Sequence, residues 1–186
     1  MVPIMSLWIP ILVSAVLVFI VSAIIHMVLP YHKKDWKKME KEDELLDAFR
    51  KIGVAPGDYM APCAGGYQAM KDPAFQEKMK RGPIVLMTVM SPHAGMGKSL
   101  AQWFLYCVLV GIFAAYLTGR AFGPGTDYRT VFRFTGTTAF LGYSLALIQT
   151  SIWYHRSWGN TIRHLIDGLI YALLTGGVFG AMWPDA

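Results

Sequence analysis

The chain has 186 residues, of which 54% are hydrophobic and 16% are charged, and its mean hydropathy is +0.39. Soluble globular proteins carry about 25% charged residues, so this composition argues against a soluble protein and predicts an integral membrane protein. The net charge of +5 does not indicate nucleic-acid binding, because twelve of the 17 Lys and Arg residues lie between Lys33 and Lys98, after an apolar run. Basic residues in that position are typical of topology signals and of contacts with anionic lipids.

Four apolar runs are long enough to cross a bilayer as helices, at roughly 20 residues per crossing. The first contains one strongly polar residue, His26, and ends before Pro30. The third is less hydrophobic than the others, and the fourth contains an aspartate. The four runs are Leu7 to Leu29, Ser99 to Leu117, Val131 to Trp153 and Thr161 to Trp183.

Small residues in the third and fourth runs occur at spacings that favour close helix packing. Gly176 and Gly180 form a G-x-x-x-G pair, and Gly142 with Ala146 forms a weaker pair of the same kind. Small residues let helix backbones approach closely. We therefore expect both runs to pack against other parts of the protein.

The polar stretch between the first and second runs predicts a small folded module. Apolar residues at helical spacing in Glu42–Ile52, with acidic residues in the first turn, predict a helix. Asp72 followed by Pro73 predicts the start of a second helix. A short extended piece is expected at 58–61 and a β-strand at 84–90, which is rich in β-prone apolar residues.

These elements predict an all-α membrane protein, a bundle of four transmembrane helices with a small α/β insert between helices 1 and 2. Residues 1–30 form the first transmembrane helix, 31–98 the insert module, and 99–186 the three helices that complete the bundle. Because the basic residues of the insert flank the first helix, the positive-inside rule predicts a cytoplasmic insert with both termini outside. The N-terminus does not resemble a transit peptide, so we expect a plasma membrane location, in the inner membrane of a bacterium.

Two patterns resemble known motifs but are incomplete. Residues 95–99 (GMGKS) imitate the end of a phosphate-binding loop, yet the first glycine of the full motif would fall at Pro92. The helix that follows is a predicted membrane span, so we expect no nucleotide binding. Cys63 and Cys107 belong to no C-x-x-C pair, which leaves a disulfide framework, a zinc ribbon and a covalently attached haem unsupported.

Polar residues at similar depth in the predicted spans form the candidate site. Counted from the insert side, His26, Gln102 and Gln149 each lie about one helical turn into the first, second and third spans. In the fourth span, His164 lies about one turn in and Asp167 about two. The spacing of these two residues places them on one helix face.

An ionisable residue within a span is costly, and Asp167 is flanked by apolar residues. Its carboxylate must pair, bind a cation or become protonated. Arg163, four residues earlier, and His164 can both reach it. A metal site would use His26, His164 and Asp167, and a haem would be held by His26 and His164. A hydrogen-bonded network that only fixes helix register, and a proton, quinone or lipid head-group site, are the alternatives.

All five histidines lie toward the insert side of the spans, because His32, His93 and His155 flank them there. This asymmetry favours a site at the cytoplasmic face over scattered structural histidines. The number is too small for the repeated histidine motifs of a membrane di-iron oxygenase.

Two functions follow from these patterns. The first is a non-catalytic accessory or structural subunit of a larger membrane complex, in contact with lipids and with other membrane proteins or further copies of itself. The lack of a complete catalytic motif argues against an enzyme. The second is a redox membrane protein that binds a transition metal or haem through the His/Asp layer. A transporter ranks behind both, because the spans show no clear internal repeat.

Overall fold

The structure, a computed structural model, describes residues 1–92 and 95–186. The chain divides into two compact units. One, the helical unit, consists of Met1–Lys37 and Met96–Ala186, and the other, the insert unit, of Lys38–Gly95.

The helical unit contains four long helical stretches, in agreement with the four apolar runs of the sequence. Each is long and apolar enough to cross a membrane, which indicates a membrane-embedded protein. Within the described residues these stretches are Ile4–Val28, Met96–Ala121, Tyr128–Trp153 and Trp158–Ala181. Their α-helices are α1 (Trp8–Ala23), α4 (Met96–Ala121), α5 (Tyr128–Tyr143), α6 (Ile148–Trp153) and α7 (Trp158–Ala181).

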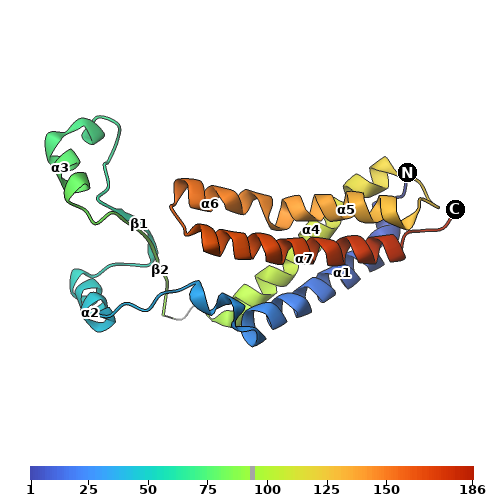
Figure 1. Ribbon diagram of the computed structural model, residues 1–186, viewed down its shortest axis with the longest axis horizontal. Helices are drawn as coiled ribbons and strands as arrows, with labels where there is room; N and C mark the ends of the chain where they lie inside the picture. Colours follow the sequence, from blue (N-terminus) through green and yellow to red (C-terminus); the bar gives the residue numbers. More distant parts are fainter. Residues whose placement is uncertain (93–94) are drawn as a thin grey trace. The chain divides into compact units, whose positions relative to one another are not determined.

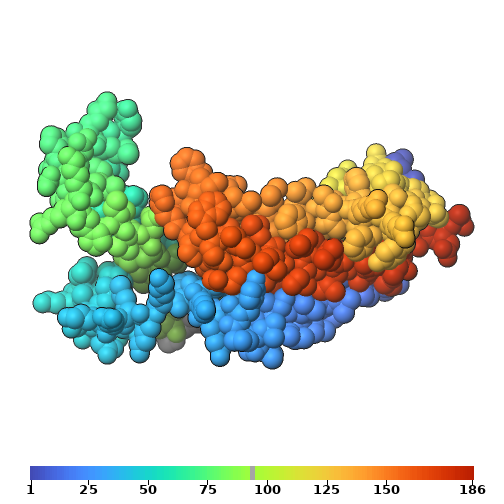
Figure 2. Space-filling view, in the orientation of Figure 1, coloured from blue at the N-terminus to red at the C-terminus, as the bar shows by residue number. Residues whose placement is uncertain are grey.

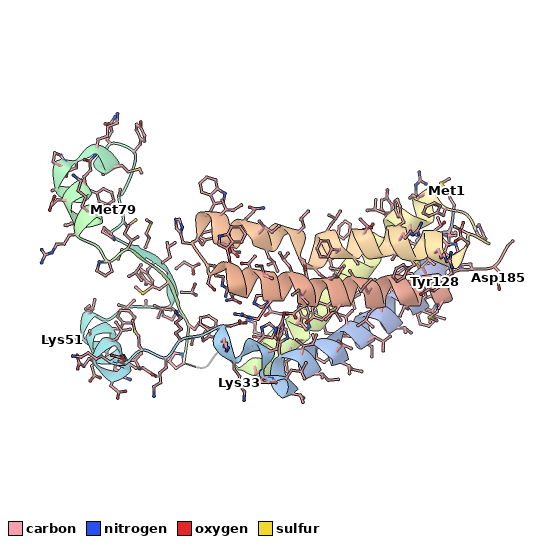
Figure 3. All side chains as sticks on the ribbon, in the orientation of Figure 1. Met1, Lys33, Lys51, Met79, Tyr128 and Asp185 are labelled. Carbon is pink, nitrogen blue, oxygen red and sulfur yellow. The ribbon has the colours of Figure 1, made fainter. Side chains whose placement is uncertain are left out.

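Packing contacts join the long helices: α1 lies against α4 and α7, and α5 lies against the same two helices. Figures 1 and 2 show α7 between α1 and α5. Val18, Ala139 and Tyr171 are among the buried residues at the centre. The chain ends lie together at one end of this unit, near Tyr128, and Lys33 lies at the opposite end (Figure 3). The candidate site is at the Lys33 end.

The third stretch is broken, where the sequence predicted one continuous helix. Ser144 has φ −136° and ψ −44°, and a 3-10 turn then leads into α6. The Ser144 hydroxyl donates to the carbonyl of His164 at 3.4 Å. A Cβ atom on Gly168 would lie 1.5 Å from Ser144 Oγ, so glycine is needed for α7 to approach this break.

The expected packing role of the Gly176 and Gly180 pair is confirmed. A Cβ atom on Gly176 would lie 2.7 Å from the carbonyl oxygen of Phe132 and 3.2 Å from the Cα of Gly136, both on α5. At Gly180 it would lie 2.7 Å from the ring of Tyr128. Backbone contact of this kind is what small residues permit between membrane helices.

The insert unit contains α2 (Glu42–Ile52), β1 (Gly57–Ala61), α3 (Pro73–Arg81) and β2 (Val85–Val89). The two helices, the extended piece and the strand predicted from the sequence are thereby confirmed. The strands pair in antiparallel fashion, and the Asp72 carboxylate caps α3 by accepting from the N–H of Ala74 at 2.9 Å. No described residue of this unit is buried, so it has no hydrophobic core of its own.

We predict that Gly176→Ala destabilises the helical unit, because the new methyl group would overlap backbone atoms of α5, and these cannot move without shifting the helix. Overpacking of this kind costs about 1–3 kcal/mol. The adjacent Gly177 is the matched control, since a Cβ there would meet only Tyr128 Oη, at 3.8 Å. Thermal unfolding in detergent should show a lower midpoint for Gly176→Ala and an unchanged or higher one for Gly177→Ala. Equal midpoints would contradict the close contact between α5 and α7.

Candidate metal centre

Three imidazole rings and one carboxylate converge at the Lys33 end of the helical unit. One potential ligand atom from each of His26, His32, His164 and Asp167 lies within 4.8 Å of the others. The ring centroids of His26 and His32 are 4.2 Å apart, and that of His32 is 5.2 Å from that of His164. His26 lies at the end of the first helical stretch, His32 lies in the turn that follows it, and the other two residues lie on α7.

The chain reverses after α1, and this reversal places His32 over His26. α1 continues into a π-helical turn, Ile24–Val28, that carries His26. Leu29 is extended, as a residue before proline prefers, and a 3-10 turn over Pro30–Lys34 carries His32. π-helical turns often occur at functional sites.

Two of the histidines are oriented through their Nδ1 atoms. His26 Nδ1 lies 3.0 Å from the carbonyl oxygen of Ser22, and His32 Nδ1 lies 2.6 Å from Asp35 Oδ2. Carbonyl and ionised carboxylate oxygens only accept hydrogen bonds, so Nδ1 donates in both rings. In the neutral ring, Nε2 then keeps its lone pair, as a metal ligand requires.

Asp35 supports His32 and is itself held by Arg163. Its Oδ1 accepts from Arg163 Nε at 2.6 Å, and the Asp35 side chain is only 6% exposed. Burial raises the pKa of Asp35, but the hydrogen bonds from His32 and Arg163 and the charge of Arg163 outweigh it and leave the pKa below its usual value. Asp35 is therefore ionised at neutral pH, and its charge is balanced by Arg163.

Asp167 is the least satisfied member of the group. It is 2% exposed, and among the described residues neither of its oxygens, nor His32 Nε2, has a hydrogen-bond partner. His32 Nε2 lies 3.0 Å from Asp167 Oδ2, without hydrogen-bond geometry. Two ligands at about 2.1 Å from one metal ion, at near-octahedral to tetrahedral angles, are about 3.0 to 3.4 Å apart. The separation of these two atoms matches a shared ion.

Two tyrosines interact electrostatically with Asp167. Tyr31 Oη and Tyr171 Oη are buried and have no hydrogen-bond partner within the described part of the chain. Burial raises the pKa of Tyr31, and the nearby charge of Asp167 raises it further. Both phenols are therefore available to donate to a water or hydroxide held near Asp167.

The structure brings His26, His164 and Asp167 together, as a metal site would require. Arg163, which was expected to reach Asp167, bonds to Asp35 instead, because the chain reversal brings Asp35 to it. Gln102 and Gln149 are both exposed.

Of the remaining histidines, His32 joins the cluster, whereas His155 is exposed and outside it. His93 lies outside the described residues. The role of His32 and Asp35 was not expected from the sequence. Their spacing of three residues directly after Pro30 was the available signal, since it lets a carboxylate reach an imidazole.

A haem held by His26 and His164 does not fit this arrangement. Their ring centroids are 6.2 Å apart, and a porphyrin would have to lie between them. The ring of His32 lies 4.2 Å from one and 5.2 Å from the other, so it occupies that space. The side chains of the cluster are of the types that bind a single metal ion.

Comparison of the chain with known protein families, curated proteins and solved structures finds no match. The class of protein is therefore described from its fold and its side-chain cluster alone. The described residues contain four helical stretches of membrane-spanning length, and a cluster of three histidines and one aspartate lies at one end of them.

We predict that Asp35→Ala destabilises the helical unit by on the order of 3 kcal/mol, because it leaves the Arg163 charge unpaired. This is the low end of the range for a buried pair, since the Arg163 side chain is 21% exposed. The exposed Asp185 supplies the control, and Asp185→Ala should leave thermal unfolding unchanged. Because the pKa of Asp35 is lowered, the wild-type contribution persists at neutral pH and is lost only as the pH falls below about 4. Identical unfolding of Asp35→Ala and Asp185→Ala would show that the pair contributes nothing.

Proposed function

We propose that this is a membrane protein that binds a divalent transition-metal ion through His26, His32, His164 and Asp167. The observation that carries the proposal is the buried Asp167 carboxylate, which has no hydrogen-bond partner among the described residues and lies beside the unpartnered Nε2 of His32. A buried carboxylate without a hydrogen-bond donor is strongly unfavourable. A cation shared with neutral imidazoles would remove that cost.

The donor set of three imidazoles and one carboxylate suits zinc, iron, copper or nickel. Asp35 and the Ser22 carbonyl orient two of the imidazoles, as outer partners do in metal sites. Zinc could take these four ligands as a tetrahedral site. An octahedral ion would keep open positions for water or substrate. Iron or copper would give the redox role expected from the sequence, whereas zinc would act only as a Lewis acid.

The location of the site follows from the same proposal. Lys33, Lys34 and Lys37 lie beside the cluster, at the end of the first membrane-length stretch. By the positive-inside rule this end faces the cytoplasm, and both chain termini face outward. A bacterial inner membrane is the corresponding compartment.

The insert unit favours a second role, that of an accessory subunit in a larger membrane complex. No described residue of this unit is buried, and its exposed apolar side chains include Leu45, Leu46 and Ile52. Side chains of this kind are typical of a surface that is covered by a partner. Native mass spectrometry after extraction in mild detergent tests this role, and detection of the bare chain alone would contradict it.

We predict that full-length protein, stripped with a chelator and reloaded with Co²⁺, binds one ion per chain. Coordinated Co²⁺ has visible absorption bands that report its ligands. His32→Ala and Asp167→Ala should each weaken binding by at least about tenfold, because each removes a ligand. Asp35→Asn should weaken it by about 10- to 100-fold, the range for outer partners of metal ligands.

His155→Ala is the matched control, because this histidine is exposed and outside the cluster. It should bind Co²⁺ like the wild type. Protein that binds no metal, or binding that survives Asp167→Ala, would refute the metal centre. A Soret band in freshly purified protein that is lost in His26→Ala would establish the haem alternative instead.

A further inference from the structure

A pocket opens directly beside the metal cluster. Its volume is about 560 Å³, and His26, His32 and His164 line it together with Lys33, Arg156 and Asn160. A molecule in the pocket would therefore contact three of the four proposed ligands. We propose that this pocket binds a phosphate group, as a further ligand of the metal ion. The inference rests on the proposed metal site.

The charges that line the pocket favour an anion. Asp35 is the one acidic residue in its lining, and its two oxygens are already held by Arg163 and His32. Lys33 and Arg156 have no ion pair among the described residues. With a divalent ion bound to Asp167, the pocket would carry uncompensated positive charge. A cationic ligand is disfavoured for the same reason.

Asn160 is a second observation that points to a ligand. It is 4% exposed and lines the pocket, yet its Oδ1 atom has no hydrogen-bond partner in the described part of the chain. It lies in the first turn of α7, three residues after the Ser157 cap. Helix N-termini attract phosphate groups through their free N–H groups and dipole. The Oδ1 atom of Asn160 is an acceptor, so it can bond to a protonated phosphate oxygen or to a hydroxyl of a phosphate ester.

Exposed apolar residues also line the pocket. Met27 and Val28 line it and are 70% and 72% exposed, and both lie in the last turn of the first membrane-length stretch. Trp36, 79% exposed, is a further lining residue. An acyl chain could pack along Met27 and Val28 while its phosphate reaches Lys33 and the metal. The pocket can thus take a phosphate from a phospholipid in the membrane or from a soluble phosphate compound.

The test uses full-length protein in dodecyl maltoside, which contains no phosphorus, loaded with paramagnetic Co²⁺ or diamagnetic Zn²⁺. The probes are inorganic phosphate and phosphatidic acid in mixed micelles, and the measurement is ³¹P relaxation. We expect faster relaxation in the Co²⁺ protein than in the Zn²⁺ protein for at least one probe. Faster ³¹P relaxation with phosphatidic acid alone identifies the ligand as a lipid head group. Faster relaxation with inorganic phosphate alone identifies the ligand as a soluble phosphate compound.

Lys33→Ala and Arg156→Ala should keep the Co²⁺ absorption bands but weaken phosphate binding by at least about tenfold, as loss of a charge-assisted hydrogen bond does. Lys34→Ala is the control, because Lys34 is a neighbouring lysine outside the pocket lining and should change neither signal. Equal relaxation in the Co²⁺ and Zn²⁺ proteins overturns the phosphate pocket while the metal centre stands.

Absence of Co²⁺ bands refutes the metal centre itself. In that case, calorimetric titration of the metal-free protein with the same probes tests the pocket separately. Phosphate binding that is weakened by Lys33→Ala then supports a phosphate ligand in this pocket. No binding overturns the pocket as well.

Discussion

The buried carboxylate of Asp167 is the constraint around which this end of the molecule is arranged. A carboxylate removed from water without a partner costs several kcal/mol, and the described residues offer no hydrogen-bond donor to either of its oxygens. As neutral rings, His26 and His32 cannot fill that role, because they use their Nδ1 protons elsewhere. His164 Nδ1 lies 3.7 Å from Asp167 Oδ2, which is too far for a hydrogen bond. In our proposal a divalent cation resolves this conflict and uses the Nε2 lone pairs that the Nδ1 hydrogen bonds of His26 and His32 leave free.

The support around the cluster extends through several elements. Ser22 holds His26 through its carbonyl, and its hydroxyl accepts from Trp103 Nε1 at 2.8 Å, which joins α4 to α1 beside the site. Asp35 connects the 3-10 turn to Arg163 on α7. The ligand positions thus depend on packing between helices, and a metal site needs such support to keep its geometry.

Local sequence signals predicted the elements well and the site only in part. Apolar run length defines the four membrane-length helices, and the Asp72 cap marks the start of α3. His164 and Asp167 could be paired because spacing on one helix fixes their common face. The position of His32 depends on the chain reversal at Pro30, which no periodic pattern records. Gln149 was placed by depth alone, but depth does not fix the direction of a side chain around the helix axis, and Gln149 follows the break at Ser144.

Among the proposed ligands, His26 and His32 lie at and just after the end of the first long helical stretch, and the other two lie in the last stretch. A chain inserted into a membrane from its N-terminus would therefore present His26 and His32 long before His164 and Asp167 exist in place. The complete coordination set appears only when the final helix has docked against the first. Tight metal binding would then distinguish fully assembled chains from partly inserted ones, because the latter could hold the ion only weakly.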